Sequence, residues 1–91
     1  MTTDERWERV AEAIVSTPGA LPEETRRAIA RDEDPPELAA LLDKVRRAAY
    51  TIGEADVAGL DDDVVVEAAL AAALGVALDR RAAALEAVER A

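Results

Sequence analysis

The segment from Val64 to Leu78 constrains the fold more than any other part of the chain. It consists of Ala, Leu, Val and Gly, with a single charge at Glu67. A helix built from it is apolar on nearly every face, so it belongs at the centre of a protein or in a subunit interface. The segment is too short to span a lipid bilayer. We therefore expect the rest of the chain to be organised around it.

Elsewhere, apolar residues recur at helical spacing, and no stretch alternates as a β-strand does. Prolines, glycines and capping residues divide the chain into about five helices. Thr2 or Thr3 caps the first, and Thr51 begins a T-x-x-E capping box at the fourth. The sequence predicts a single all-α domain over residues 1–91, a bundle of about five helices with a long apolar C-terminal helix. The predicted helices cover about 3–16, 22–31, 36–49, 52–60 and 62–89.

Association between copies is predicted from the small core. The chain has 91 residues, no Phe, one Trp and one Tyr, and much of its apolar content is Ala. A domain of this size and composition buries little apolar surface, so it gains stability from partners. We therefore predict a homo-oligomer. The expected interface lies on adjacent faces of the last helix: Val66, Leu70, Ala73, Leu74, Ala77 and Leu78.

Charge and composition exclude several classes of function. The net charge of −9 argues against binding nucleic acid by phosphate neutralisation and against anionic membranes. Without Cys the chain has no disulfide, thiol redox centre or thiolate metal site. Without His it lacks the commonest general base and metal ligand. We expect no cofactor and no metal. The N-terminal residues lack the apolar run of a signal peptide, which predicts a cytoplasmic location.

Two segments in succession resemble a known superfamily. PELAALLDKVRRAAYTIGEADVAGL, from Pro36 to Leu60, is followed by VVVEAALAAALGVALDRRAAAL, from Val64 to Leu85. Together with PGALPEETRRAIA upstream, they resemble the carboxymuconolactone decarboxylase / alkylhydroperoxidase D-like superfamily over roughly residues 18–85. The resemblance implies an all-helical fold whose subunits associate through their helices.

The resemblance also implies which residues would carry the family's chemistry. Its peroxidase members use a C-x-x-C-x-x-x-H motif at a helix start, with a glutamate upstream for proton relay. These positions fall on Ala49, Ile52 and Asp56, with the upstream acid at Glu37. Both thiols are absent and the histidine position is Asp, so only the glutamate matches. We therefore expect a short member without thiol peroxidase chemistry.

Four side chains are candidate acid, base or ligand-binding groups. Glu37 is either a retained relay acid or a solvated carboxylate in the first turn of a helix. Asp56 either faces a pocket or is solvated. Tyr50 either donates a hydrogen bond in a cavity or packs between helices. Glu67 lines a pocket, pairs with an arginine such as Arg46 or Arg47, or lies on an exposed strip of its helix.

The leading hypothesis is a diverged, non-peroxidase protein that acts as a helical, oligomeric structural or interaction protein. The alternative is a cofactor-free, decarboxylase-like enzyme or a binding module for a small organic acid or lactone. Its ligand would occupy an apolar pocket where the third to fifth helices meet. Both alternatives require Glu37 or Glu67 to converge on one cavity with other polar groups.

Overall fold

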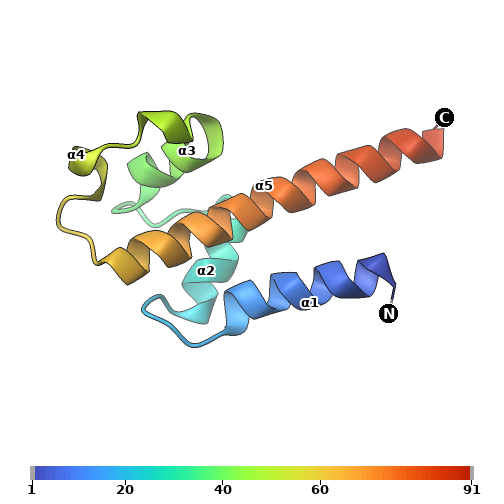
Figure 1. Ribbon diagram of the computed structural model, residues 1–91, viewed down its shortest axis with the longest axis horizontal. Coiled ribbons are helices and arrows are strands. Elements are labelled where there is room, and N and C mark those ends of the chain that lie inside the picture. The colour runs from blue at the N-terminus through green and yellow to red at the C-terminus, as the bar shows by residue number, and fades with distance from the viewer. Residues whose placement is uncertain (1, 91) are drawn as a thin grey trace.

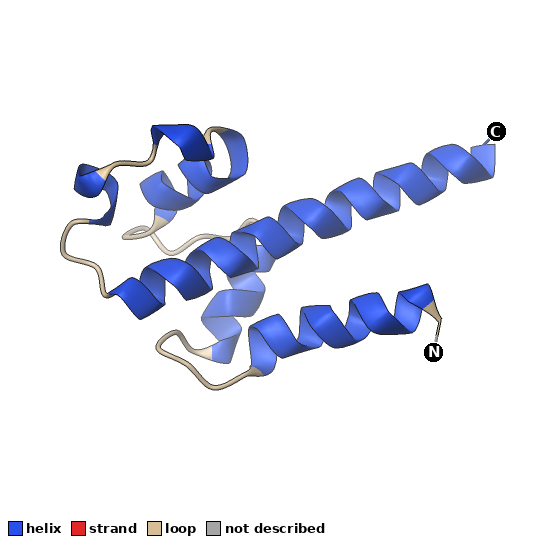
Figure 2. Cartoon of the chain, viewed as in Figure 1, coloured by secondary structure: helices blue, strands red, loops and turns tan. Residues whose placement is uncertain are grey.

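The computed structural model describes residues 2–90, which form α-helices joined by short loops (Figure 1). Figure 2 shows no strand among these residues. The prediction of an all-α chain with five helices is confirmed. In chain order the elements are α1 (Thr3–Ser16), α2 (Glu23–Ala30), α3 (Ala39–Arg47), the 3-10 turn η1 (Ala49–Thr51), α4 (Glu54–Val57) and α5 (Asp62–Arg90).

α5 is the element against which the other long helices pack. In the view of Figure 1, α2 lies behind it, α3 lies on one side and α1 on the other. α1 runs antiparallel to α5, so its start lies beside the second half of that helix. There the guanidinium of Arg81 pairs with Asp4 and lies 5.9 Å from the centre of the Trp7 ring. Within residues 2–90, α5 included, every helix is too short or too polar to cross a membrane.

α5 turns its smallest side chains inward. Ala68, Ala71, Ala72 and Gly75 are buried, and their spacing places them on one face of the helix. Because these side chains are small, α2 and α3 approach the α5 backbone closely. On another face of the helix, Ala73 is exposed, and Ala69 and Ala77 are half-buried. The buried cluster consists of Ile29, Leu38, Leu42, Ala68, Ala71 and Ala72.

The contact between α2 and α5 is tightest at Gly75. A Cβ atom added there would lie 2.4 Å from the carbonyl oxygen of Ala30, the last residue of α2. Real Cβ atoms do not approach a backbone oxygen this closely, so any side chain at this position requires one helix to move. The glycine is thus required by packing, although glycine weakens a helix interior.

A pair of partly buried charges joins the loop after α2 to α3. Arg46 of α3 binds both carboxylate oxygens of Asp34, at 2.6 and 2.7 Å, and also donates to the carbonyl of Ile29 at 2.9 Å. The side chains of Arg46 and Asp34 are only 14% and 12% exposed. A guanidinium that binds both carboxylate oxygens has a fixed geometry. This contact therefore ties the loop after α2 to the last turn of α3.

The limits of the first and last helices agree with those predicted from the sequence, whereas the limits of the helices between them differ. Thr2 caps α1, accepting the N–H of Glu5 at 3.1 Å, as predicted. Residues 36–38 form a turn rather than the first turn of α3, because the N–H groups of Leu38 and Ala39 bond three residues back. α3 therefore spans only Ala39–Arg47.

The predicted capping box at Thr51 is wrong. The Thr51 hydroxyl donates backwards to the carbonyl of Ala48 at 2.7 Å, closing η1. The helix start lies two residues later, where the N–H of Gly53 donates to the Asp56 carboxylate at 2.9 Å. Asp56 thus serves as the acid of the cap in place of Glu54. Gly59, with φ of +78°, follows this short helix and turns the chain towards α5.

Substituting Gly75 tests the closest helix contact. Gly→Ala inside a helix normally stabilises by about 1 kcal/mol. Here the added methyl group meets backbone, so we expect Gly75→Ala to lower the free energy of unfolding by about 1–3 kcal/mol. Urea denaturation followed by circular dichroism, at fixed protein concentration, measures this change. Gly53→Ala is the control, because its Cβ would meet nothing within 4 Å. A Gly75→Ala protein as stable as the parent would contradict the described packing.

Candidate functional site

Glu67 fastens the loop between α1 and α2 to α5. Its two carboxylate oxygens accept the backbone N–H groups of Ala20, at 2.8 Å, and Leu21, at 3.2 Å. A carboxylate that accepts two N–H groups satisfies donors that would otherwise be left unpaired in a loop. Glu67 therefore pairs with backbone rather than with an arginine. Arg46 and Arg47 bind aspartates elsewhere.

A hollow of about 430 Å³ lies beside this contact, between the end of α1, the loop and the first turns of α5. Apolar side chains from α1 and α5, Ile14 and Leu70, form part of its wall. The polar groups that line it include Arg26, Asp63 and Glu67. Of the four candidate residues, Glu67 borders this hollow; the hollow between α3 and α5, of about 270 Å³, contains none of the four.

Arg26 is the unusual group in this hollow. It is 4% exposed, and its Nη1 donates to the carbonyl of Ile14 at 3.1 Å. Its Nε–H is buried without a hydrogen-bond partner. Among residues 2–90 it forms no ion pair with a carboxylate. A buried charge without a counter-ion costs stability, and Arg26 is the one charged side chain among residues 2–90 that is fully buried.

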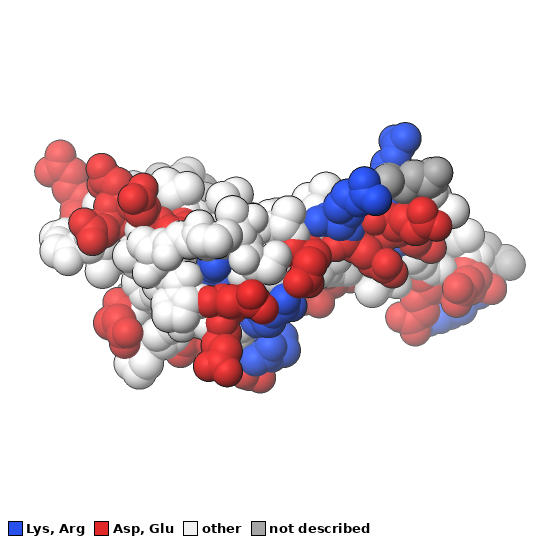
Figure 3. Space-filling model, turned by 90° about the horizontal axis from the view of Figure 1, so that it is seen from below, with Lys and Arg blue, Asp and Glu red and all other residues white. Residues whose placement is uncertain are grey.

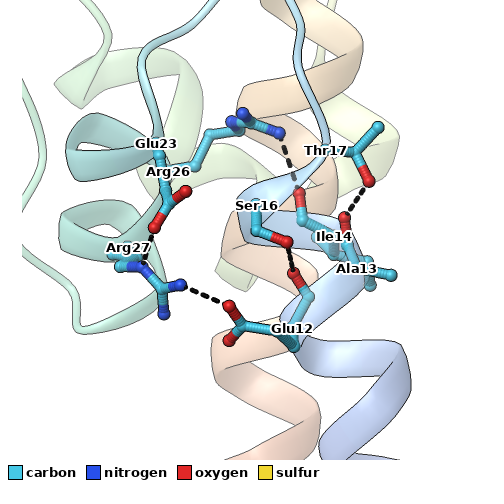
Figure 4. Close-up of polar contacts among 8 residues, drawn as sticks. All are labelled: Glu12, Ala13, Ile14, Ser16, Thr17, Glu23, Arg26 and Arg27. Carbon is cyan, nitrogen blue, oxygen red and sulfur yellow. Dashed lines mark hydrogen bonds and ion pairs between the residues drawn. The ribbon is translucent and has the colours of Figure 1, made fainter.

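Figure 4 contrasts Arg26 with the next residue in the chain. Arg27 reaches two carboxylates, those of Glu12 at 2.7 Å and Glu23 at 2.8 Å, near the surface. Arg26 points between α1 and α2 towards a single carbonyl. Our sequence reasoning missed Arg26 because it stands in the charged run EETRR. The available signal was its position three residues before the buried Ile29, on the same helix face.

Asp56 is held as a carboxylate. Lys44 Nζ donates to it at 2.8 Å and the N–H of Gly53 at 2.9 Å. The hydrogen bond from Lys44, followed by that from Gly53, lowers the pKa of Asp56 below its ordinary value. A lowered pKa is the opposite of what a general acid near neutral pH requires. Asp56 thus links α3 to α4 through Lys44.

The remaining candidates lie apart from the hollow. Tyr50, in η1, is 91% exposed, and Glu37 is exposed in the turn before α3. The other positions of the superfamily motif, Ala49 and Ile52, are exposed and half-buried. The structure therefore does not bring Glu37, Tyr50, Asp56 and Glu67 to one cavity. Within residues 2–90, no three acidic side chains lie close enough together to hold a metal ion.

The predicted interface residues divide into two groups. Leu74 is buried within the chain, and Leu78 is half-buried in a hollow that it shares with Val15 of α1. Val66 and Leu70 are 56% and 50% exposed, Ala73 is exposed and Ala77 is half-buried. We call these four residues, Val66, Leu70, Ala73 and Ala77, the open stripe of α5. In Figure 1 no other element covers the near side of α5, between α1 and α3.

Comparisons with known proteins give no match: no family model fits the chain, and no curated protein or solved structure is similar to it.

The pH dependence of stability tests the contacts of Asp56. Because its pKa is lower in the folded chain than in the unfolded chain, the carboxylate stabilises the fold at neutral pH. This contribution begins to disappear below about pH 4 and is lost as the pH falls through the folded-state pKa. We expect Asp56→Asn to lower the Tm at pH 7, and the difference from the parent to shrink towards pH 3.

The matched control for this measurement is Glu54→Gln, which changes an exposed acid in the same short helix. It should show little difference from the parent at either pH. A Tm difference for Asp56→Asn that stays constant from pH 7 to pH 3 would mean that the lost contacts do not depend on the charge of this group.

Proposed function

We propose that this chain is a diverged, non-peroxidase member of the alkylhydroperoxidase D-like superfamily that works as a homo-oligomeric structural or interaction protein. The observation that supports this most is the open stripe of α5, an uncovered row of apolar side chains in the middle of the longest helix. The absence of Cys and His supports the non-peroxidase part of the proposal. Oligomer formation would place the open stripe out of contact with water.

The arrangement of the open stripe distinguishes it from ordinary surface residues. Single exposed apolar residues are common on folded proteins. Here the four lie on one helix face at spacings of four, three and four residues, which is the pattern of a helix–helix contact. None of the stripe residues carries a charge. Such a row of side chains favours association with another apolar helix.

The division of side chains on α5 gives a second argument. Along the first half of the helix, the inward face consists mainly of Ala and Gly, whereas Val66 and Leu70 point outward. Most helices of small domains place their larger apolar residues inward. In α5, Leu74 is the large side chain that is buried with the Ala and Gly residues, whereas Val66 and Leu70 lie on the exposed face. This division is expected of a subunit and unfavourable for an isolated monomer.

Leu70→Gln tests the proposed interface. Burying a leucine contributes about 1.5–3 kcal/mol, and a two-fold interface loses this twice, so the Kd should rise by a factor of about 100 or more. Light scattering after size exclusion, over a hundredfold concentration range, gives the native mass. We expect an oligomer for the parent chain and dissociation for Leu70→Gln.

Leu85→Gln is the matched control, because Leu85 lies on the same helix and is 48% exposed, compared with 50% for Leu70. It lies outside the open stripe, so the oligomer should survive this change. A monomeric parent chain, or equal effects of the two substitutions, would rule out the open stripe as the interface.

A second candidate function, the binding of a small organic acid, is favoured by one observation: the buried Arg26 beside the hollow. A carboxylate ligand would supply the counter-ion that the chain does not provide, and Ile14 and Leu70 would contact its apolar part. NMR titration with butyrate tests this. We expect saturable shifts of the amide signals around the hollow, abolished by Arg26→Met and retained in Arg27→Met. Absence of shifts in the millimolar range would exclude this function for monocarboxylates of that size.

A further inference from the structure

The open stripe is bounded by charges of opposite sign. Asp62 and Asp63 precede it at the start of α5, and Arg80 and Arg81 follow it. Asp62, Asp63 and Arg80 are exposed, and none of them forms an ion pair within residues 2–90. Arg81 pairs with Asp4 of α1. One face of α5 is thus acidic at one end, apolar in the middle and basic at the other end.

Figure 3 shows acidic side chains at the left end of the molecule, where α5 begins in Figure 1, and both acidic and basic side chains over its right half. If a second copy lies against this face of α5 in the opposite direction, its basic end meets the acidic end of the first copy, and the apolar parts meet in the middle. Two copies side by side in the same direction would instead place acid against acid, in a chain whose net charge is already −9.

The spacing along α5 is symmetric about a point between Ala71 and Ala72. Leu70 and Ala73 lie equally far from that point, and so do Val66 and Ala77. The Asp62-Asp63 and Arg80-Arg81 pairs are also equally far from it. A two-fold axis at this level would therefore match every feature of the face with its complement in a second copy.

We propose that two copies of this chain pair their α5 helices antiparallel about a two-fold axis level with Ala71 and Ala72, so that Asp62 of each copy faces Arg80 of the partner subunit. The proposal rests on the open stripe being the interface. It adds the direction, the register and the charged pairs of the contact. The occupant of the open stripe is thereby a second copy of the same chain.

The apolar contacts of this register join a larger side chain to a smaller one. Val66 meets the partner's Ala77, and Leu70 meets the partner's Ala73. Pairing a branched side chain with alanine lets two helices approach closely without leaving a void. A shift of one turn would bring Leu70 against the partner's Ala77 and leave Val66 level with the partner's Arg81. Because Leu70 meets an alanine in either register, charge rather than size selects between them.

The charged contacts agree with the side of α5 on which each group lies. Asp62 and Arg80 are separated by five helical turns, so they share one flank, and Arg80 lines the hollow beside α3. Asp63 and Arg81 share the other flank, where Asp63 lines the hollow beside α1. When two helices pair antiparallel about a two-fold axis, a given flank of one helix lies on the same side as the same flank of the other helix. Asp62 therefore meets the partner's Arg80, and Asp63 lies towards the partner's Arg81.

Cysteine cross-linking tests the relative direction of the two α5 helices. Because the parent chain has no Cys, only the introduced cysteines can form a disulfide. Two α5 helices paired antiparallel hold their residues 66 about 16 Å apart along the axis, beyond the reach of a disulfide, which requires Cα atoms within about 7 Å. We expect Val66→Cys alone to form no disulfide dimer under mild oxidation. Mixed with Ala77→Cys, it should form a mixed disulfide, identified by mass spectrometry. Self-linked Val66→Cys dimers would overturn the antiparallel direction.

Charge reversal tests the register. Asp62→Arg and Arg80→Asp each turn two attractive contacts into two repulsive ones, so each should weaken the dimer roughly tenfold at low salt. The double variant Asp62→Arg/Arg80→Asp should recover the parent Kd. Single variants that dimerise like the parent would overturn the register. Failure of the open stripe itself gives a different result, a monomeric parent chain, so the two proposals are separable.

Discussion

The close contact between the end of α2 and Gly75 is the constraint on which the remaining structure depends. Because Gly75 has no side chain, the backbone at the end of α2 lies directly against α5. The α5 residues that face α2 and α3 are therefore mainly Ala and Gly. Small side chains can be buried by short helices, so an eight-residue α2 and a nine-residue α3 are enough to cover that face. Of the larger apolar residues of α5, Leu74 is buried, whereas Val66 and Leu70 remain exposed. The open stripe is the direct consequence.

Charged groups in this chain mainly fix the paths of loops. Arg46 holds the segment after α2 through Asp34, and Glu67 holds the loop before α2 through two N–H groups. α2 is thereby anchored to its neighbours at both ends. Arg26 differs, because its charge lies between helices without a carboxylate beside it. A group of that kind is a local cost to stability, which is a reason to connect it with a ligand.

Sequence patterns predicted the number and type of helices because α1 is amphipathic with a clear cap at Thr2, and because α5 is a long run of helix-forming residues that is almost continuously apolar in its first half. They failed at Thr51, where two acids, Glu54 and Asp56, stood at plausible capping positions and only the path of the chain decided between them. They also missed the partners of Glu67, since backbone N–H groups carry no residue-specific signal. The burial of Leu74 required knowing that α1 covers that side of α5, which periodicity does not contain.

The last turns of α5, residues 82–90, differ from the rest of the helix in their expected dynamics. From residue 82 to residue 90 every side chain is exposed, and no neighbouring element covers these turns in Figure 1. Their amide hydrogens are protected only by the helix itself, so they exchange with solvent through local fraying. The amides around Ala71 and Ala72 exchange only when α2 and α3 separate from α5. A single continuous helix therefore contains both the slowest and some of the fastest exchanging amides of the fold, and its secondary structure extends well beyond its cooperative folding unit.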